Sequence, residues 1–569
     1  MQVSNPSKRW ILAAKIDAKT DEVLSPYPSF LRQILFNRGI RTIEQADAYL
    51  RASTPLADPF LLLDMDKAVE RLWTAIENDE GIAVYGDYDV DGVSATALMV
   101  EVIRRLGGNV TRYIPNRFDE GYGLNLGAIQ FLADSNAKVI LTVDCGIRSP
   151  READLARELG VDLIISDHHY PQGDLPQGYA VLCPKREGDP YPDKDLAGVG
   201  VAFKIAQGLI QRSGRVDVNA EEWLDLVALG TVADIVPLTG ENRVMVRKGL
   251  SLIRLGRRPG LTALAGVAGK DYRTTTATDI GFILGPRLNA AGRMESALQA
   301  YELLIGDSLQ EVGKAAQILE NQNKDRQIQT RKAQEKAQGD LGDIGDQKLV
   351  AAFSEEYSSG IIGLVASRLV ETYYRPALVG SIDGDEIRAS CRSIPEFHIT
   401  KALDECADLL VRHGGHSMAA GLTVRSENMD ALVMRLQEIA ERKLAGLDLR
   451  PALRADVELD ISEIAPQLYT QLEDLQPTGM GNPSVTFITR GVHLDKMSRM
   501  GEDGKHISFA VRGCKIGRAV AFNQGAWFDT WMRGDPEFDI AYSIDLNRYF
   551  DRVTQQLNIK DIRLSGQPD

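Results

Sequence analysis

Short apolar runs alternate with amphipathic segments between residues 81 and 165. The runs at 82–85, 139–143 and 161–165 have strand length, whereas 94–106 places its apolar residues at helical spacing. Ser149 followed by Pro150 begins another helix, because Ser caps a first turn and Pro suits its first position. This alternation predicts a parallel sheet with helices on both faces, and further helices at 199–210 and 221–233.

The segment 307–339 contains no Pro and is rich in Gln, Lys, Glu and Ala. This pattern is typical of a long, largely solvated helix, which could connect two lobes rigidly. A second α/β unit follows it. Its strands are expected at 348–353 and 377–382, and its helices at 361–373, 399–411 and 428–444.

The pattern changes again after about residue 451, where β-branched and aromatic residues predominate. Strands are expected at 485–489, 507–512, 518–522, 538–546 and 556–564, with a hairpin turn at 501–504. Five strands in this length fit a small barrel of the OB type, and a generic β-sandwich is the alternative. Most of the aromatic residues here should lie in the barrel core, although some could stack on nucleic-acid bases: Trp527, Trp531, Tyr542, Tyr549 and Phe550.

A chain of 569 residues is too long for one hydrophobic core. The predicted fold class is α/β, with two α/β lobes joined by a long helix and a C-terminal OB-like β-barrel. The expected division is an N-terminal helical segment (1–70), a first lobe (71–300), a connecting helix (301–345), a second lobe (346–450) and the barrel (451–569).

Composition narrows the class of protein. No apolar run approaches the ~18 residues of a membrane span, and the first ten residues lack the apolar core of a signal peptide. The five cysteines form no CxxC pair, which fits a reducing, cytoplasmic setting. The net charge of −15 argues against a protein that coats nucleic acid, but it allows an enzyme with a local basic groove.

The run Gly86-Asp87-Tyr88-Asp89-Val90-Asp91-Gly92 places three carboxylates at alternate positions directly after a predicted strand. A calcium hand would need a preceding helix and a glutamate at loop position twelve, where this chain has Leu98. A solvated turn is the other alternative. Three carboxylates so close together repel one another unless a cation lies among them, so a metal site is favoured.

Two further predicted strands are also followed by potential metal ligands. Asp144 follows the strand at 139–143, and Asp167-His168-His169 follow the strand at 161–165. The carboxyl ends of strands in such sheets line one crevice, and Asp234 at the end of a predicted helix could point into it. Carboxylates with one or two imidazoles suit Mn²⁺ or Mg²⁺. There are enough ligands for two ions, which ~4 Å apart would clamp a phosphate and activate a water for in-line attack.

The second lobe contains the run Gly414-Gly415-His416-Ser417-Met418-Ala419-Ala420-Gly421. It could be a glycine turn before a tightly packed helix, or an anion site at a helix N-terminus. Ser390 and Arg392 on a neighbouring strand favour a phosphate site, since a hydroxyl and a guanidinium would add to the backbone donors.

The segments GDYDVDG, VDCG, SDHH and VADIVPL resemble the ordered motifs of the DHH phosphoesterases. The resemblance implies that the metal ligands are Asp89, Asp91, Asp144, His168 and Asp234. It further implies that Asp144 bridges two ions and that three residues complete the catalytic set: Asp87 as a ligand or an orienting residue, Asp167 as an orienting residue for a histidine ring, and His169 as a contact to the scissile phosphate or the leaving oxygen.

The GGH and Ser-x-Arg-Ser segments resemble the DHHA1 lobe of the same enzymes. By that resemblance the substrate is bound by Ser390, Arg392, Gly414, Gly415 and His416. The run NAAGRM resembles the family's motif between the lobes, which implies that Asn289 and Arg293 also bind substrate, Arg293 by gripping a phosphate. Arg117 is a further candidate, for which an ordinary surface charge is the alternative.

The order of these parts is similar to that of the RecJ-type exonucleases, which also resemble this chain at PTGMGNP (477–483). The resemblance implies processive 5′→3′ degradation of single-stranded DNA to 5′-mononucleotides with two Mn²⁺ or Mg²⁺ ions, in recombination and mismatch repair. It also implies work beside the single-stranded-DNA-binding protein and a RecQ-type helicase. We expect a cytoplasmic monomer without membrane association.

Three other functions compete with this one. A DHH enzyme for small substrates such as dinucleotides would share the site, but it would not need the β-rich domain or the N-terminal segment. A non-catalytic scaffold should have lost ligands, whereas every motif aspartate and both histidines are present. A purely DNA-binding OB protein would not explain the clustered carboxylates.

Overall fold

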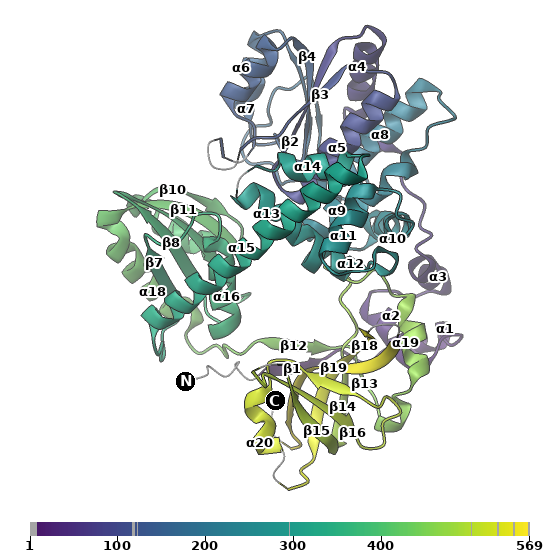
Figure 1. Cartoon of the computed structure of the whole chain (residues 1–569), viewed down its shortest axis with the longest axis vertical. Coiled ribbons are helices and arrows are strands. Elements are labelled where there is room, and N and C mark those ends of the chain that lie inside the picture. The colour runs from purple at the N-terminus through teal and green to yellow at the C-terminus, as the bar shows by residue number, and fades with distance from the viewer. Residues whose placement is uncertain are drawn as a thin grey trace. The chain divides into compact units, whose positions relative to one another are not determined.

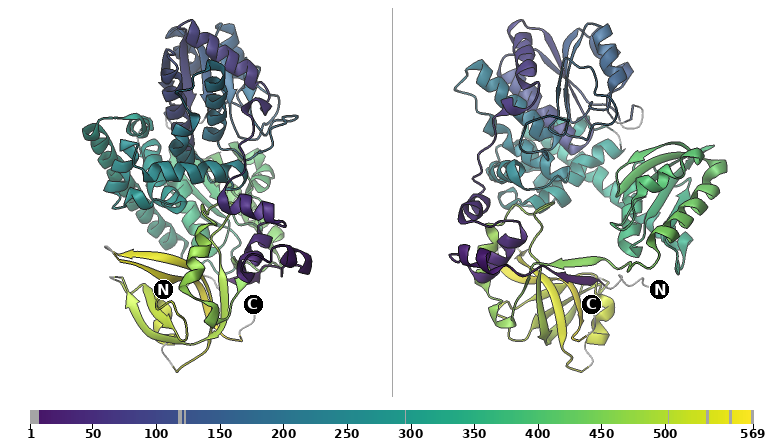
Figure 2. Two further views of the ribbon diagram at one scale, coloured as in Figure 1. Left: turned by 90° about the vertical axis from the view of Figure 1, so that its right-hand side faces the viewer. Right: turned by 180° about the vertical axis from the view of Figure 1, so that it is seen from behind.

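The computed structural model describes residues 8–116, 120–121, 123–294, 296–501, 503–531, 534–549 and 552–566 (Figures 1 and 2). The chain forms two compact units. One comprises residues 44–324 and 474–484, and the other comprises 1–43, 325–473 and 485–569. Among the helices of the described ranges, none combines the length and the apolar character needed to cross a membrane.

The first unit is built on a five-stranded sheet whose neighbouring strands are all parallel. Its strand order is β3 (Val110–Tyr113), β2 (Gly81–Gly86), β4 (Ala137–Val143), β5 (Asp162–Ser166) and β6 (Ala180–Leu182). The three strands predicted from the apolar runs are confirmed. Because all five strands are parallel, their carboxyl ends lie along one edge of the sheet.

Helices cover both faces of this sheet, as predicted (Figure 1). Successive strand residues point to opposite faces, so Ile82 and Val84 join one core cluster while Ala83 and Tyr85 join another. The first cluster includes residues of α4 (Met65–Glu77), α5 (Val90–Arg105) and α8 (Gly198–Ser213), and the second those of α6 (Leu126–Asp134) and α7 (Pro150–Glu158).

A helical layer completes the unit with α9 (Leu224–Ala233), α10 (Gly240–Arg254), α11 (Pro259–Val267), α13 (Gly285–Met294) and α14 (Leu298–Ile305). Helix α9 packs against α5, α8 and α10, and residues 224–231 are all buried. This packing fixes the residue that follows the helix, Asp234. The predicted helices at 199–210 and 221–233 are confirmed as α8 and, with a preceding 3-10 turn, α9.

The predicted long helix is confirmed as α15 (Leu309–Leu341). Its 33 residues span roughly 50 Å at 1.5 Å per residue. Glu320 near its start receives a hydrogen bond from Arg287 at 2.6 Å, whereas Ala333 and Ala337 near its end belong to the core cluster around Val350. The division between the two units falls within this helix.

The second unit contains a mixed five-stranded sheet in the order β10 (Leu410–Gly415), β11 (Ala419–Arg425), β9 (Glu386–Arg392), β8 (Ala377–Asp383) and β7 (Val350–Ser354). Only β7 and β8 pair in parallel. Helix α16 (Ile362–Tyr373) packs on one face, and α17 (Ile399–Asp404) and α18 (Met429–Leu444) pack on the other.

The helix predicted at 399–411 is wrong beyond Asp404. Residues 410–415 form β10 and residues 419–425 form β11, and a turn at His416–Ala419 joins the two strands. Gly415 has φ +149°, and a Cβ there would collide with the Ala419 carbonyl, so the turn requires glycine. Pairing of β10 with β11, which in turn pairs with β9, overrides the local helical pattern.

The C-terminal part of this unit forms a seven-stranded sheet in the order β13 (Val457–Glu458), β14 (Phe487–Val492), β18 (Phe538–Tyr549), β19 (Arg552–Leu564), β17 (Ala519–Ala521), β16 (His506–Val511) and β15 (Leu494–Met500). The five predicted strands are confirmed, and β13 and β15 are additional. Strands β15 and β16, which flank the predicted turn, pair in antiparallel fashion, and residue 502 of that turn lies outside the described residues. Trp531 and Tyr542 are core residues and Trp527 is exposed, whereas the Tyr549 side chain and Phe550 lie outside the described residues.

The N-terminal segment is not purely helical as expected. Residues Arg9–Leu12 form β1, which pairs in parallel with β12 (Ala452–Ala455). Three helices then follow, α1 (Ala18–Val23), α2 (Ser29–Asn37) and α3 (Ile43–Arg51). A four-residue strand gives little sequence signal when its partner is hundreds of residues away.

Candidate active site

The aspartate-rich run lies between β2 and α5, where Asp89 is the N-cap of the helix. The Asp89 carboxylate accepts hydrogen bonds from the Asp91 amide at 2.8 Å and the Gly92 amide at 3.2 Å. A Cβ on Gly92 would lie 2.5 Å from the Asp87 nitrogen, so only glycine allows so tight a loop. The loop therefore gathers three carboxylates at the carboxyl end of β2.

The Asp91 carboxylate is held by the first turn of α8. Its two oxygens accept hydrogen bonds from the Gly198 amide at 2.6 Å and the Val199 amide at 2.9 Å. The positive end of the helix dipole favours a carboxylate at this position. A Cβ on Gly230 of α9 would lie 2.6 Å from Asp91 Oδ1, so a second glycine makes room on the other side.

Asp144 directly follows β4 and has φ +65°, in the left-handed region. Aspartate adopts this conformation more readily than most residues, although it remains uncommon and occurs often at functional sites. A Cβ on Gly198 would lie 2.5 Å from the Asp144 Cβ. The backbone of Asp144 and the start of α8 thus fix the position of its carboxylate.

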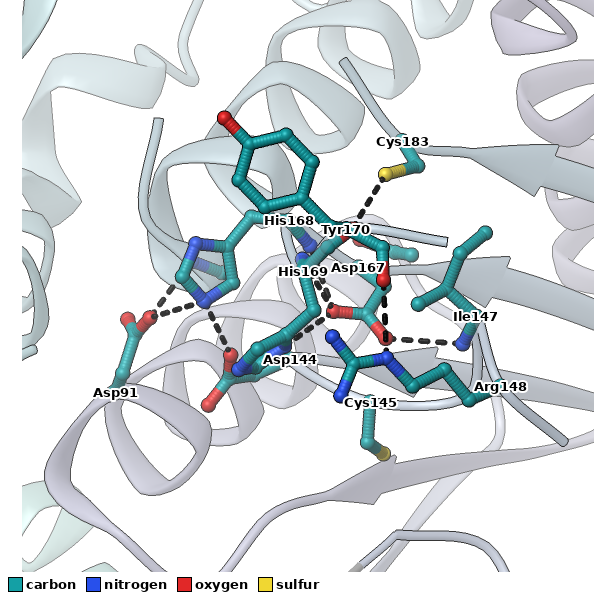
Figure 3. Close-up of polar contacts among 12 residues, drawn as sticks. Asp91, Asp144, Cys145, Ile147, Arg148, Asp167, His168, His169, Tyr170 and Cys183 are labelled. Carbon is teal, nitrogen blue, oxygen red and sulfur yellow. Dashed lines mark hydrogen bonds and ion pairs between the residues drawn. The ribbon is translucent and has the colours of Figure 1, made fainter. Parts of the chain in front are cut away.

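The triplet Asp167-His168-His169 follows β5 and places its side chains in two directions (Figure 3). His168 points at the other carboxylates. Its Nε2 lies 3.1 Å from Asp144, 3.5 Å from Asp234 and 4.0 Å from Asp91. Asp167 instead accepts from the Ile147 amide at 2.9 Å and lies 2.7 Å from His169 Nδ1.

Potential ligand atoms form three overlapping groups, each within 4.8 Å: Asp87, Asp89 and Asp144; Asp91, His168 and Asp234; and Asp144, His168 and His169. Asp144 and His168 each belong to two of the groups. The structure therefore brings together every residue predicted as a metal ligand, together with Asp87 and His169. Asp167 lies beside these groups through its contact with His169.

The electrostatics of the site are those of crowded carboxylates. Burial and Asp89 raise the pKa of Asp91 to about 7, and burial and Asp91 raise that of Asp234 to about 9, although Lys185 opposes the latter shift. Burial and the neighbouring aspartates raise the pKa of Asp144 well above its usual value. Burial would also raise the pKa of Asp167, but the two histidines and the Ile147 amide outweigh it and lower that pKa to about 2.

These residues fit divalent cations. Burial lowers the pKa of His168 to about 3, so the ring is neutral and can donate its lone pair to a metal. Asp144 Oδ1 and both ring nitrogens of His168 are buried, and although Nε2 lies 3.1 Å from Asp144 Oδ1, none of these atoms makes a hydrogen bond of good geometry within the described residues. A bound cation would satisfy these atoms and offset the carboxylate repulsion, and a set of carboxylate oxygens with one or two imidazoles suits Mn²⁺ or Mg²⁺.

Two residues were predicted to bind substrate between the lobes, Asn289 and Arg293, and both lie on α13. Asn289 on α13 accepts a hydrogen bond from the Val90 amide at 3.2 Å, so it braces the aspartate-rich loop. Arg293 lies on the same helix, whose Gly292 packs against Tyr88. Arg117 lies outside the described residues.

The predicted phosphate site of the second lobe does not have the helix that the sequence suggested. Gly414 and Gly415 lie on β10, and His416 lies in the turn after it. Gly414, Gly421 and Ser390 are cross-strand neighbours on β10, β11 and β9.

A different helix approaches Ser390 and Arg392. A Cβ on Gly363, in the first turn of α16, would lie 3.0 Å from Arg392 Nη2 and 3.1 Å from Ser390 Oγ. Arg392 also donates to Ser390 Oγ at 3.0 Å. The helix whose first turn approaches these two residues is therefore α16.

Sequence reasoning missed several residues of both sites. Gly198, Gly230 and Gly363 matter because a side chain would collide with a functional group from a distant segment. The glycines in LAGVGVAF could have drawn attention to the start of α8, because glycine at a helix start allows close approach. Lys185, which acts electrostatically on Asp234, belongs to no motif that could be recognised in the sequence.

Comparisons with known proteins match three parts of the chain to family domains and nearly the whole chain to two curated relatives. Residues 81–231 match the N-terminal domain of the DHH family, residues 345–442 the DHHA1 domain, and residues 455–561 the RecJ OB domain. The single-stranded-DNA-specific exonuclease RecJ of Bacillus subtilis (strain 168) is 37% identical over 94% of this chain and 67% of its own length. RecJ of Escherichia coli (strain K12) is 33% identical over 96% of this chain and 97% of its own length.

The chain belongs to the RecJ family of single-stranded-DNA-specific exonucleases. Among solved structures, RecJ from Thermus thermophilus in complex with Mn²⁺ has a TM-score of 0.85 and 29% identity, and it covers 99% of this chain and 80% of its own. The expected family and fold class are thereby confirmed: a DHH lobe, a DHHA1 lobe and a C-terminal OB domain. As a RecJ family member of the DHH phosphoesterases, the chain is a metal-dependent hydrolase.

Proposed function

We propose that this enzyme removes nucleotides one by one from the 5′ end of single-stranded DNA, using two divalent cations, Mn²⁺ or Mg²⁺, and that it releases 5′-mononucleotides. The observation that carries the proposal is the overlap of the three ligand groups through Asp144 and His168. A residue shared by two groups suits a bridge between two ions. The RecJ relatives, named as single-stranded-DNA-specific exonucleases, support the choice of substrate.

The proposed ligands are Asp89, Asp91, Asp144, His168 and Asp234, with Asp87 close enough to join Asp89 and Asp144. Divalent cations there supply Lewis-acid activation of the phosphate and lower the pKa of an attacking water. The protein holds the carboxylates against their mutual repulsion, chiefly through the α8 amides on Asp91 and the left-handed backbone of Asp144. A water oxygen bonds to phosphorus, the P–O3′ bond breaks, and O3′ of the released nucleotide takes up a proton.

His169 is proposed to act on the leaving oxygen. Asp167 is ionised, since its pKa is about 2, and it fixes the proton of His169 on Nδ1 through the 2.7 Å contact. Nε2 is then the ring nitrogen left to pass a proton to O3′ or to contact the scissile phosphate. Asp167 is therefore a positioning residue for His169.

The second lobe is proposed to bind the phosphates of the strand. Arg392, Ser390 and the first turn of α16 combine a guanidinium, a hydroxyl and backbone amides. Arg388 and Arg412 line an adjacent pocket of about 310 Å³ with Gly414 and Gly421. His416, Asn289 and Arg293 complete the proposed substrate-binding set.

The proposed cellular role is the one that membership of the RecJ family implies. It comprises recombination and mismatch repair in the cytoplasm, as a monomer beside the single-stranded-DNA-binding protein and a RecQ-type helicase. Size-exclusion chromatography with light scattering tests the monomer. Pull-down with each purified partner tests the two interactions. If neither partner binds, both interactions are contradicted.

The deciding experiment uses a single-stranded oligonucleotide labelled at its 3′ end, with Mn²⁺ or with EDTA. A ladder that shortens from the 5′ end, absent in EDTA and on blunt duplex, supports the proposal. Asp89→Ala and Asp144→Ala should abolish the ladder while the protein stays folded, and a fully active Asp144→Ala enzyme would refute the two-metal assignment. Hydrolysis of dinucleotides without cleavage of long strands would favour a small-substrate DHH enzyme instead.

A further inference from the structure

A lysine lies at the catalytic edge of the first sheet without belonging to any motif. Strand β6 is parallel to β5, so its carboxyl end meets the same edge as Asp167, His168 and His169. Lys185 follows three residues after β6.

Lys185 has an aromatic partner instead of an acidic one. Its Nζ lies 4.9 Å from the centre of the Tyr170 ring, which is within cation–π distance. Within the described ranges no carboxylate lies within ion-pair distance of this ammonium, although the nearby site is full of carboxylates. Its charge is therefore available to a ligand that comes to the site.

Tyr170 directly follows His169 and is 62% exposed, which is unusual for so large an aromatic residue at an otherwise buried site. Its backbone is fixed, because its carbonyl accepts a hydrogen bond from Arg148 Nε at 2.9 Å (Figure 3). The neighbouring His169 carbonyl accepts from Cys183 Sγ at 3.4 Å. An exposed ring is thus attached to a rigid backbone one residue from the catalytic histidine.

We propose that Tyr170 and Lys185 form a strand-binding rim beside the metal groups: the Lys185 ammonium binds a backbone phosphate next to the scissile one, and the Tyr170 ring supports a base. This proposal rests on the proposed function, because it needs a nucleic-acid strand at the site. An ammonium contacts any phosphate and a ring stacks on any base, so the rim holds a strand without reading its sequence.

The chain offers a matched control for the lysine. Lys67 of α4 also lies over a tyrosine ring, 4.8 Å from the centre of Tyr179. Tyr179 precedes β6, so this pair lies at the edge of the sheet opposite to the metal groups. Lys67→Ala removes the same kind of contact from the same domain without touching the site.

The first test measures steady-state kinetics on a 3′-labelled oligonucleotide at several salt concentrations. Lys185→Ala should raise KM several-fold with little change in kcat, and it should make the dependence of log(kcat/KM) on log[salt] shallower by about 0.7, the value for one phosphate contact on a single strand. Lys185→Arg should restore both, and Lys67→Ala should resemble the wild type. A Lys185→Ala enzyme that matches Lys67→Ala in KM and salt dependence overturns the proposal.

A second test locates the contacts on the strand. One phosphate at a time is made neutral as a methylphosphonate, and one nucleotide at a time is made abasic. One neutral linkage near the 5′ end should weaken strand binding by the wild type. The same linkage should not weaken binding by Lys185→Ala any further. One abasic position should likewise weaken binding by the wild type and leave binding by Tyr170→Ala unchanged. Additive effects at every position would show that neither side chain touches the strand.

Failure of the proposed function would be seen separately. If the wild type degrades no strand, the proposed function fails whatever the rim does. Binding of a fluorescent single strand in EDTA, followed by anisotropy, then judges the rim alone. Weaker binding by Lys185→Ala than by Lys67→Ala supports the rim, and equal binding refutes it.

Discussion

The amide of Gly198 donates a 2.6 Å hydrogen bond to Oδ2 of Asp91, so the first turn of α8 and the aspartate-rich loop form one rigid assembly. The same glycine lies against Asp144, where a Cβ would be 2.5 Å from the Asp144 Cβ. A single backbone position thus sets the locations of two carboxylates that come from different strand ends. Helix α8 therefore contributes to the site although it supplies no ligand.

Gly198→Ala should inactivate the enzyme without unfolding it. The methyl group would displace Asp144 or the start of α8, and a misplacement of ~1 Å can cost roughly 100-fold in rate. The measurement is kcat on a single-stranded oligonucleotide, with thermal unfolding as the check on the fold.

Gly200→Ala is the matched control, two residues along the same helix. Its Cβ would meet Leu196 at 3.4 Å, an ordinary contact, so activity should remain within a few-fold of the wild type. Equal activities for the two variants would show that the close approach of Gly198 is unimportant.

Asp144→Asn should abolish hydrolysis while keeping the backbone. Asparagine tolerates the left-handed conformation that Asp144 adopts at φ +65°, so the change removes charge and little else. Isothermal titration with Mn²⁺ should show loss of at least one bound ion. Asp154→Asn on α7, an exposed residue paired with Arg157, should retain full activity and full metal binding. Unchanged metal stoichiometry in Asp144→Asn would contradict the bridging role proposed for this residue.

Metal binding should stabilise the protein more as the pH rises. Burial and neighbouring carboxylates raise the pKa values of Asp91 and Asp234 to about 7 and about 9, whereas an unfolded aspartate titrates near about 4. Between these values the metal-free folded state binds more protons than the unfolded state, so its stability falls as pH increases. Bound Mg²⁺ removes this dependence by keeping the carboxylates ionised.

The measurement is the difference in melting temperature between Mg²⁺ and EDTA at pH 6, 7, 8 and 9. The difference should grow across this range, and Asp234→Asn should reduce the growth most between pH 7 and 9. A difference that is constant or shrinks with pH would contradict the raised pKa values.

Arg392→Ala should weaken substrate binding more than catalysis. It removes a guanidinium that lies beside Ser390 and the first turn of α16. Hydrogen bonds to charged groups contribute about 1.5–3 kcal/mol, so KM should rise roughly 10- to 100-fold with a small change in kcat. Arg368→Ala, on the exposed side of α16 and paired with Glu371, is the control and should leave KM unchanged. A fall in kcat alone would place Arg392 outside the proposed phosphate site.

The strand ends of the site could be predicted because each follows a recognisable apolar run. Asp87 to Asp91, Asp144 and Asp167 to His169 all continue strands that the sequence shows clearly, and parallel pairing brings such ends to one edge. Lys185 could not be found in this way, because β6 has only three residues. The role of Gly198 was also hidden, since it depends on the position of Asp144, a residue of another segment.

The second lobe shows the limit of local pattern more clearly. The apolar spacing before Gly414 suits a helix, but β10 and β11 form a hairpin that extends the sheet from β9. Backbone pairing of β10 with β11 decided the structure there, and the helix whose first turn approaches Ser390 and Arg392 is α16. The residue types of this lobe predicted a phosphate site, which stays a proposal, whereas the secondary structure predicted for 405–411 was wrong.

The order of the ligands along the chain has a consequence for the newly made enzyme. The loop from Asp87 to Asp91 leaves the ribosome first, but its carboxylates are completed by Asp144, His168, the start of α8 and finally Asp234. A nascent chain that ends before α9 lacks one of the three ligand groups. Such a polypeptide can assemble at most part of the proposed ligand set, so the full set forms only after residue 234 has been translated.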